Sequence, residues 1–574
     1  MRHLIFTMTL FFLSLNLLAA GHRFVVIPVE FSDVSFTDIH SSVNDKVNTA
    51  REYFNEQFSP SLSFTFDILP IVRVSKPYAW YGANSSTRKD ARIGELVREA
   101  VNGSAASFSV YDNDSDGTID NIYIITAGHN EAYGMGADWI WPQQSKLSEH
   151  GESFQVSGKT VDCIAVCTED SPASIFCHEL GHVFGLQDMY DTDGNGSGGL
   201  SQGLWGKLSP MDLSSSDGSL DLPPNFSAIE LEQLGIGKKI TYFQGPCHLR
   251  PLSQSKEYLR IDTDTDGEYY LLECRKPEGW DAGLGGGGLV IYHIDRSDSD
   301  SWYSDLYSRN LSAQERWRYN QVNCRPDRQC AQVISAIPGT NDLAKVFFPQ
   351  GTRRTFCSDT DPSFRFWNGN TSNVAIDRIS MEADGSVSFN IVSPVSILAT
   401  HVFQDAIIIN WQTAEALNVK DCYVSWYLSD VKGGSMKGSS VSHVQANNMF
   451  YTIIEGLDPS TDYSIRIRAI SETGQAFSSI VRLSTKGRQK GVRPFIYLNS
   501  LSRREDGSFF VGDRVPMRVY NLENVGQVLW YFNGVRMRPE SDGYWHLTQS
   551  GTLKVEIWYK DGSKEIITKE MKVR

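Results

Sequence analysis

The feature that most constrains the fold of this chain is the run His-Glu-Leu-Gly-His-Val-Phe-Gly-Leu-Gln-Asp, which extends from His178 to Asp188. On a helix, His178 and His182 lie one turn apart on the same face, so both imidazoles can bind one zinc ion. Glu179 lies beside them, where it can take a proton from an attacking water. Gly185 can adopt a positive φ and turn the chain back, so that Asp188 becomes a third ligand. Three protein ligands leave a fourth position open, and the pattern therefore predicts a zinc hydrolase.

A methionine downstream narrows the class of zinc hydrolase that the sequence predicts. Met211 follows a glycine-containing loop in the run LWGKLSPMDL, residues 204–213. A zinc motif followed by such a methionine resembles the metzincin zinc peptidases, in which the methionine underlies the metal site. The usual third ligand of metzincins is a histidine, and Asp188 holds that position here, a variant that some members share. Together, the runs 178–194, 204–213 and 226–236 are similar to the M6 family, the immune inhibitor A type of secreted bacterial metallopeptidase.

The resemblance to M6 peptidases extends over residues 22–394 and implies both a fold and a reaction. It implies an α/β metzincin-like zinc peptidase domain followed by a β-rich domain, with Zn²⁺ as cofactor and polypeptides as substrates. Peptide hydrolysis comes from the resemblance, because the metal motif alone allows other metal-assisted hydrolyses. Several metzincins use a tyrosine two residues after the methionine to stabilise the oxyanion. Leu213 holds that place here, and Tyr190 is a speculative substitute.

Two other functions compete with this interpretation. One is a secreted binding or adhesion protein in which a non-catalytic metallopeptidase-like domain is only a scaffold. The intact Glu179 and the complete set of ligands weigh against it. The other is a zinc peptidase of gluzincin type, with Glu230 or Glu232 as third ligand. Met211 and the short spacing from the histidines to the aspartate weigh against that version.

The N-terminus predicts export. Arg2 and His3 give a basic start, an apolar run at 4–18 follows, and Ala19-Ala20 offers a small-residue cleavage site. We expect a cleaved signal peptide, a mature chain that is secreted or periplasmic, and no membrane span. The formal charge of −15 and the pI near 5.3 weigh against binding to nucleic acid or anionic membranes. We expect a monomer.

An acidic loop at 112–120 suggests a second metal. Asp112, Asp114, Asp116 and Asp120 occupy positions 1, 3, 5 and 9 of an EF-hand-like loop, with glycine at position 6. Alternate carboxylates of this kind converge on one hard cation, so Ca²⁺ is the expected ligand. Position 12 is Tyr123, which cannot supply the final carboxylate, so the loop is not a complete EF-hand. A solvated acidic turn remains the alternative.

The nine cysteines are an odd number, so at least one is unpaired or bonds elsewhere. Three cysteines lie before or within the helix predicted to carry His178 and His182: Cys163, Cys167 and Cys177. Burial or disulfide pairing is a simpler role for them than a thiol that blocks the zinc ion. Cys324 and Cys330 are close enough in sequence to close a small loop. Export permits disulfides, but the sequence does not fix their connectivity.

Hydrophobic periodicity divides the chain into parts. Strand and helix patterns alternate before residue 240, which is typical of an α/β layer order. Short alternating strands follow residue 395, and Trp411 is expected in their core. The run 457–463 resembles the fibronectin type III corner. In that corner the hydroxyl of a tyrosine, here Tyr463, forms a hydrogen bond back to the chain. The prediction is a signal peptide at 1–20, a zinc metallopeptidase catalytic domain at 21–240, a β-rich M6-associated domain at 241–394, a fibronectin type III-like domain at 395–487 and an immunoglobulin-like domain at 492–574.

Overall fold

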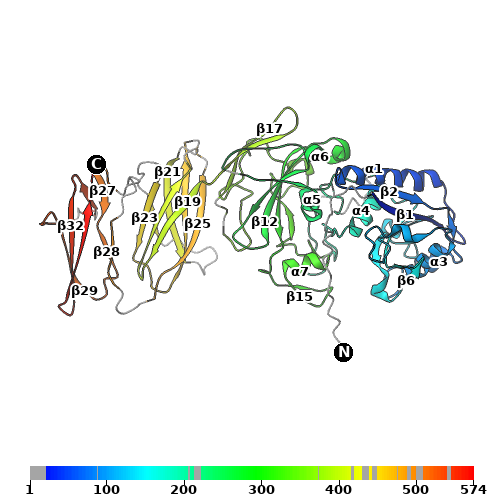
Figure 1. Ribbon diagram of the computed structural model, residues 1–574, viewed down its shortest axis with the longest axis horizontal. Coiled ribbons are helices and arrows are strands. Elements are labelled where there is room, and N and C mark those ends of the chain that lie inside the picture. The colour runs from blue at the N-terminus through cyan, green and yellow to red at the C-terminus, as the bar shows by residue number, and fades with distance from the viewer. Residues whose placement is uncertain are drawn as a thin grey trace. The chain divides into compact units, whose positions relative to one another are not determined.

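The computed structural model describes most of the chain beyond the predicted leader at 1–20. The described residues are 21–86, 88–204, 207–212, 221–242, 244–370, 372, 374–414, 419–428, 438–441, 449–472, 474, 476–487, 493–498, 508–538 and 544–574. They form two compact units, and Figure 1 shows their elements in chain order from blue to red. The first unit combines Met1–Tyr242, His248–Arg354 and Ile379–Ser388; the second combines Phe243–Cys247, Thr355–Arg378 and Phe389–Arg574. None of the described helices is long and apolar enough to cross a membrane.

A mixed sheet organises the N-terminal part of the first unit. Its order is β2-β1-β4-β8-β5, and β3 also pairs with β1. All of these pairings are parallel except that of β5 with β8. The strands are β1 (Gly21–Glu30), β2 (Ser63–Ile68), β3 (Val72–Arg73), β4 (Ile122–Thr126), β5 (Gln143–Lys146) and β8 (Cys163–Thr168).

Helices cover both faces of this sheet, as a parallel sheet with buried central strands requires. Alternate residues of β1 show the two faces: Phe24 and Val26 pack with the helices α1 (Lys46–Phe58) and α4 (Ala173–Val183). Val25 and Ile27 pack instead with α3 (Ile93–Gly103). The α/β layering expected from the sequence is therefore present around the segment that carries the histidines.

The strand-like run 62–74 forms two strands, β2 and β3, with a break between them. Pro70 lies in the break, and proline cannot donate the backbone hydrogen bond that a continuous ladder needs.

A second sheet completes the first unit, in the order β16-β13-β12-β11-β9. Every residue of its two central strands is buried, and the side chains of Leu271, Val290 and Tyr292 belong to the same hydrophobic cluster as Phe176 and Leu180 of α4. The predicted boundary at residue 240 thus falls inside one compact unit, and the division into 21–240 and 241–394 stays a prediction. The strands are β9 (Lys238–Ile240), β11 (Glu257–Asp262), β12 (Glu268–Arg275), β13 (Gly288–Asp295) and β16 (Ala331–Val333).

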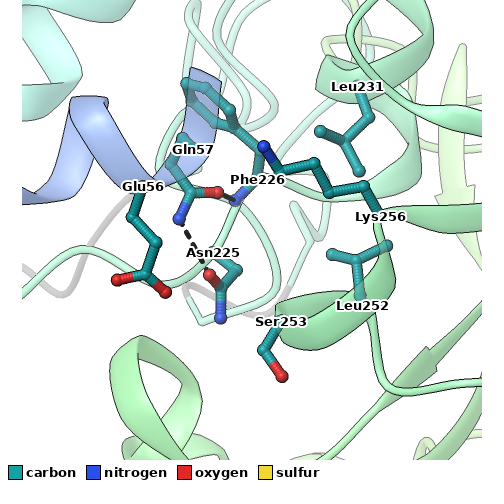
Figure 2. Close-up of a pocket in the computed structure, with 8 residues that line it drawn as sticks. All are labelled: Glu56, Gln57, Asn225, Phe226, Leu231, Leu252, Ser253 and Lys256. Carbon is teal, nitrogen blue, oxygen red and sulfur yellow. Dashed lines mark hydrogen bonds between the residues drawn. The ribbon is translucent and has the colours of Figure 1, made fainter. Parts of the chain in front are cut away.

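Figure 2 shows a small pocket in the first unit, at the C-terminal end of α1. Gln57 donates to Asn225 Oδ1 at 2.8 Å and accepts from the backbone N–H of Phe226 at 3.0 Å. None of the predicted ligands or catalytic residues lines it, so we assign it a packing role. The lining residues are Glu56, Gln57, Asn225, Phe226, Leu231, Leu252, Ser253 and Lys256.

The second unit is built from strands. A three-stranded sheet, β19-β20-β23, and a four-stranded sheet, β22-β21-β24-β25, contribute to one hydrophobic cluster. Trp411 is fully buried there and stacks on Phe450 with ring centroids 4.2 Å apart. The hydroxyl of Tyr463 accepts from the backbone N–H of Asp458 at 3.0 Å, which confirms the hydrogen bond predicted for this corner. The strands are β19 (Val395–Val402), β20 (Ala406–Thr413), β21 (Val419–Leu428), β22 (Gly438–Val441), β23 (Met449–Glu455), β24 (Asp462–Ser471) and β25 (Ala476–Ser484).

The C-terminal strands form a separate cluster around the order β30-β29-β32-β33. Two short strand pairs, β27 with β31 and β26 with β28, accompany it. The fibronectin type III-like and immunoglobulin-like assignments of these regions stay predictions. The strands are β26 (Phe495–Tyr497), β27 (Asp513–Pro516), β28 (Arg518–Tyr520), β29 (Val525–Phe532), β30 (Val535–Met537), β31 (Tyr544–Leu547), β32 (Gly551–Tyr559) and β33 (Lys564–Met571).

A buried arginine connects the second sheet of the first unit to the loop that leads to Met211. Arg275, at the end of β12, is fully buried and pairs with Glu273 at 2.6 Å and with Asp281 at 2.8 Å. Its Nη2 also donates to the carbonyl of Leu208 at 2.6 Å, in the loop that leads to Met211. The two carboxylates and the carbonyl satisfy the guanidinium, which could not otherwise be desolvated.

We predict that Arg275→Met lowers the free energy of unfolding by about 3–5 kcal/mol, because it leaves Glu273 and Asp281 buried without their cation. Urea denaturation of the full chain measures the change. Arg309→Met is the matched control: its 3.5 Å pair with Glu315 is partly exposed, and its loss should cost at most about 1 kcal/mol. Equal losses in the two variants would show that the buried network is not a main source of stability.

Candidate metal centre

Helix α4 carries both histidines of the motif and ends where the sequence predicts. Gly185 has a φ of +84°, and the backbone N–H of Leu186 donates to the carbonyl of Gly181 at 3.2 Å. Phe184 fixes this end of the helix, because its ring packs between those of Phe54 and Phe58, with centroids 5.5 and 5.1 Å away. The turn then brings the chain back toward the histidines, as the glycine allows.

Asp188 meets both histidines after this turn. Its Oδ1 lies 3.1 Å from His178 Nε2 and 3.3 Å from His182 Nε2. Two ligands of one tetrahedral zinc ion, each about 2.0–2.2 Å from the metal, are separated by about 3.4 Å. The three atoms therefore lie at the separations that a shared zinc ion requires, and they form a group of possible metal ligands.

The other ring nitrogens set the state of the imidazoles. His178 Nδ1 lies 2.9 Å from the carbonyl oxygen of Pro210, and His182 Nδ1 lies 2.8 Å from that of Leu186. A carbonyl oxygen only accepts, so each Nδ1 carries a proton, and each ring, when it is neutral, presents a lone pair at Nε2. Backbone carbonyls commonly orient metal-binding histidines in this way.

This arrangement leaves an unsatisfied buried oxygen. Asp188 Oδ1 has no hydrogen-bond partner among the described residues, although the residue is only 5% exposed. When both imidazoles are neutral, neither Nε2 can donate to it, and three lone-pair atoms then face a common point. A cation at that point satisfies all three, and the residues present fit a zinc ion.

Protonation of the histidines is the alternative to a metal ion as the source of positive charge in this cluster. Burial alone would lower the pKa of His182, but Asp188 outweighs it and raises the value to about 9. Burial would likewise raise the pKa of Asp188, and the two histidines instead hold it far below its usual range. Both shifts have one cause, a carboxylate and two bases forced together away from water.

Glu179 is buried on the same helix, with 6% of its surface exposed. Burial raises the pKa of its carboxyl, and the neighbouring His178 and His182 partly oppose that shift. A raised pKa suits a group that must accept a proton and then release it.

Met211 packs against α4 at a residue between the two histidines. A Cβ atom built on Gly181 would fall 2.5 Å from Met211 Sδ, so the fully buried thioether packs against the helix at the residue before His182. The carbonyl of Met211 also accepts from the backbone N–H of Met189 at 2.8 Å, which connects this loop to the residue after Asp188. The structure thus places the methionine against the helix that carries both histidines.

The glutamates of the gluzincin alternative have other partners. Glu230 forms the capping box of α5 (Ala228–Leu234) with Ser227 and accepts from Ser209 Oγ at 2.5 Å. Glu232 pairs with Arg260 at 3.1 Å. Neither belongs to the group of ligand atoms around Asp188. The ring of Tyr190, the speculative oxyanion residue, stacks against His178 with centroids 6.3 Å apart.

The acidic loop is only partly assembled as predicted. Carboxylate oxygens of Asp112, Asp114 and Asp116 form a second group of possible ligands, but Asp120 is not part of it. Asp120 Oδ2 accepts instead from the backbone N–H of Asn113 at 3.2 Å. Lys159 Nζ lies 2.5 Å from Asp112 Oδ2, so an ammonium group already neutralises part of the loop.

No disulfide forms among the nine cysteines, all of which lie in the described part of the chain. The loop considered for Cys324 and Cys330 is therefore not closed by a bond. Cys324 Sγ lies 3.2 Å from Thr192 Oγ1, and Cys330 Sγ donates to the carbonyl of Ala313 at 3.7 Å. Burial raises the pKa of Cys330 to about 12, which makes it an unreactive core thiol.

Sequence reasoning missed Asn320, which donates through Nδ2 to Asp188 Oδ2 at 2.6 Å. The two residues are 132 positions apart, and an asparagine after a short helix has no pattern that distinguishes it. Because Asn320 lies so far from the motif in the sequence, only the folded chain reveals its contact with Asp188.

The geometry defines a candidate metal site, and comparisons with known proteins point to the metallopeptidases. Residues 27–229 match the family described as "Immune inhibitor A peptidase M6, catalytic domain". The chain thus contains a segment with the sequence character of a peptidase M6 domain.

Curated relatives carry related names. The chain is 29% identical over 221 residues to "Pre-pro-metalloprotease PrtV" of two Vibrio cholerae serotype O1 strains, M66-2 and ATCC 39315 / El Tor Inaba N16961, covering 32% of this chain and 24% of that protein. It is 28% identical over 208 residues to "Immune inhibitor A" of Bacillus thuringiensis subsp. alesti, covering 28% of this chain and 30% of that protein. The alignments therefore span less than a third of either relative. A solved structure titled "Myokine structure" aligns with 17% of this chain and 98% of its own at 19% identity and a TM-score of 0.15, which supports no argument.

Proposed function

We propose that this protein is an exported zinc-dependent endopeptidase that hydrolyses peptide bonds of extracellular proteins. The observation that carries the proposal is the convergence of His178 Nε2, His182 Nε2 and the unsatisfied Asp188 Oδ1 at separations that suit one zinc ion. The match of residues 27–229 to M6 catalytic domains supports peptide hydrolysis over other metal-assisted hydrolyses.

The mechanism assigns each residue a distinct task. His178, His182 and Asp188 hold the zinc ion through the three atoms described above. When bound, zinc supplies Lewis acidity, which polarises the scissile carbonyl and makes water easier to deprotonate. Glu179 accepts the proton of the attacking water and then delivers it to the leaving amine. Met211 packs against the helix at Gly181 and thereby supports the segment that carries both histidines.

Export and partners follow from the sequence. We propose that residues 1–20 are a cleaved signal peptide, that the mature chain is secreted or periplasmic, and that it acts as a monomer on polypeptide substrates. The acidic character of the chain, with a formal charge of −15, favours proteins over nucleic acids as partners.

Glu179→Gln tests the general base. The amide preserves the shape of the side chain but cannot accept the proton, so proteolysis of casein should fall by at least about 100-fold while zinc stays bound. Zinc content and turnover are measured on the same preparation. If zinc is lost together with activity, Glu179 has a structural role and the assignment as base is wrong.

Asp188→Ala tests the third ligand. Two imidazoles alone hold zinc weakly, so zinc occupancy after dialysis against a chelator should drop sharply. Glu232→Ala is the matched control, because it removes a partly exposed carboxylate that pairs with Arg260. Zinc retained by Asp188→Ala but lost by Glu232→Ala would favour the gluzincin alternative.

We also propose that the loop at 112–120 binds calcium as a structural ion. Asp112 Oδ1 is buried and has no hydrogen-bond partner among the described residues, and the carboxylates of Asp114 and Asp116 lie close to it. Asp120 does not join them in this arrangement, so three carboxylates and backbone oxygens would form the site.

Calcium should raise the Tm of the full chain, because a cation that binds only the native loop stabilises the fold by mass action. The doubly substituted variant Asp114→Asn, Asp116→Asn should lose that shift while its Tm without calcium changes little, since both side chains are exposed. Magnesium at equal concentration controls for ionic strength. An unchanged Tm of the wild-type chain in calcium would identify an ordinary solvated turn.

A further inference from the structure

We propose that Asn320 is a positioning residue for the candidate zinc site, fixing which carboxylate oxygen of Asp188 faces the metal. The proposal rests on the zinc site proposed above and extends it to a residue 91 positions beyond the end of the matched peptidase segment at residue 229.

Asn320 contacts Asp188 at two points. Its Nδ2 donates to Asp188 Oδ2 at 2.6 Å, and its Oδ1 accepts from the Asp188 backbone N–H at 2.8 Å. One amide thus restrains both the main chain and the side chain of the same ligand. With Oδ2 engaged, Oδ1 is the oxygen that remains directed at the two Nε2 atoms.

The backbone around Asn320 holds the amide in place. The residue follows α7 (Ala313–Arg318) and has a φ of +54°, a left-handed conformation that asparagine adopts more readily than most residues. Trp317 anchors α7, because its indole N–H donates to the carbonyl of Asp295 at 2.8 Å. The carbonyl of Asn320 in turn accepts from Thr192 Oγ1 at 2.8 Å, just beyond the ligand.

This contact determines how Asp188 can bind a metal. A carboxylate held at one oxygen by a hydrogen bond binds a cation through the other oxygen alone. A free carboxylate can offer both oxygens, which raises the coordination number and removes the open position that hydrolysis requires. Hydrogen bonds of this kind typically alter metal affinity by about 10–100-fold.

Asn320→Gly is the decisive variant, because glycine adopts the same positive φ and loses only the side chain. Zinc affinity, measured on the full chain by competition with a chelator of known affinity, should fall by about 10–100-fold. The cobalt-substituted protein should lose visible absorbance, because a second Asp188 oxygen would raise the coordination number above four. The Tm of the metal-free protein should change little.

Asn323→Ala is the matched control. Asn323 is fully buried in the same segment and donates to the carbonyls of Met189 and Ala331 at 2.8 and 2.9 Å, without a contact to Asp188. Its loss should lower the Tm and leave zinc affinity and the cobalt spectrum unchanged. Equal losses of zinc affinity in both variants, in step with their Tm, would reduce Asn320 to a structural residue.

Asn320→Asp provides a second route if the glycine variant does not fold. Aspartate keeps an oxygen for the Asp188 N–H but cannot donate to Oδ2, so zinc affinity should fall here too. Zinc bound as tightly as in the wild type by either folded variant would overturn the proposal. A wild-type chain that binds no zinc, or an Asp188→Ala chain that binds it normally, would overturn the proposed zinc site itself.

Discussion

The rest of the candidate site depends on one electrostatic constraint, the burial of a carboxylate oxygen against two imidazole nitrogens. Asp188 Oδ1 faces His178 Nε2 and His182 Nε2 with no hydrogen-bond donor among the described residues. Such an arrangement is costly unless a positive charge joins it, either protons or a metal ion. The carbonyls behind both rings hold a proton on each Nδ1, so that Nε2 is the nitrogen of each ring that faces Asp188.

The scaffold around that constraint comes from both sheets of the first unit. The parallel sheet and α1 support α4, and the aromatic rings around Phe184 fix the end of the helix. The second sheet contributes Arg275, which holds the carbonyl of Leu208 in the loop before Met211. After β13 of this sheet, the chain continues to α7, and Asn320 follows that helix. The candidate site is therefore shared by segments that lie on either side of the predicted boundary at residue 240.

Much of this arrangement is predictable from local sequence. The helical spacing of the histidines, the positive φ of Gly185 and the return of Asp188 all follow from the motif. The run 457–463 predicts the hydrogen bond of Tyr463. The acidic loop was less predictable, because the position of Lys159 beside Asp112 depends on chain pairing outside the loop.

By itself, the sequence determined which residues are the three candidate ligands, which glutamate lies beside them and how strands and helices alternate, since each of these depends on local spacing. Only the tertiary structure decided which oxygen of Asp188 faces the histidines, which carbonyls orient their rings and how the loop of Met211 is held. Those choices depend on Asn320 and Arg275, whose contacts form across more than fifty residues of chain. A hydrogen bond between such distant residues leaves no periodic trace in the sequence, because its geometry exists only after the two sheets have packed.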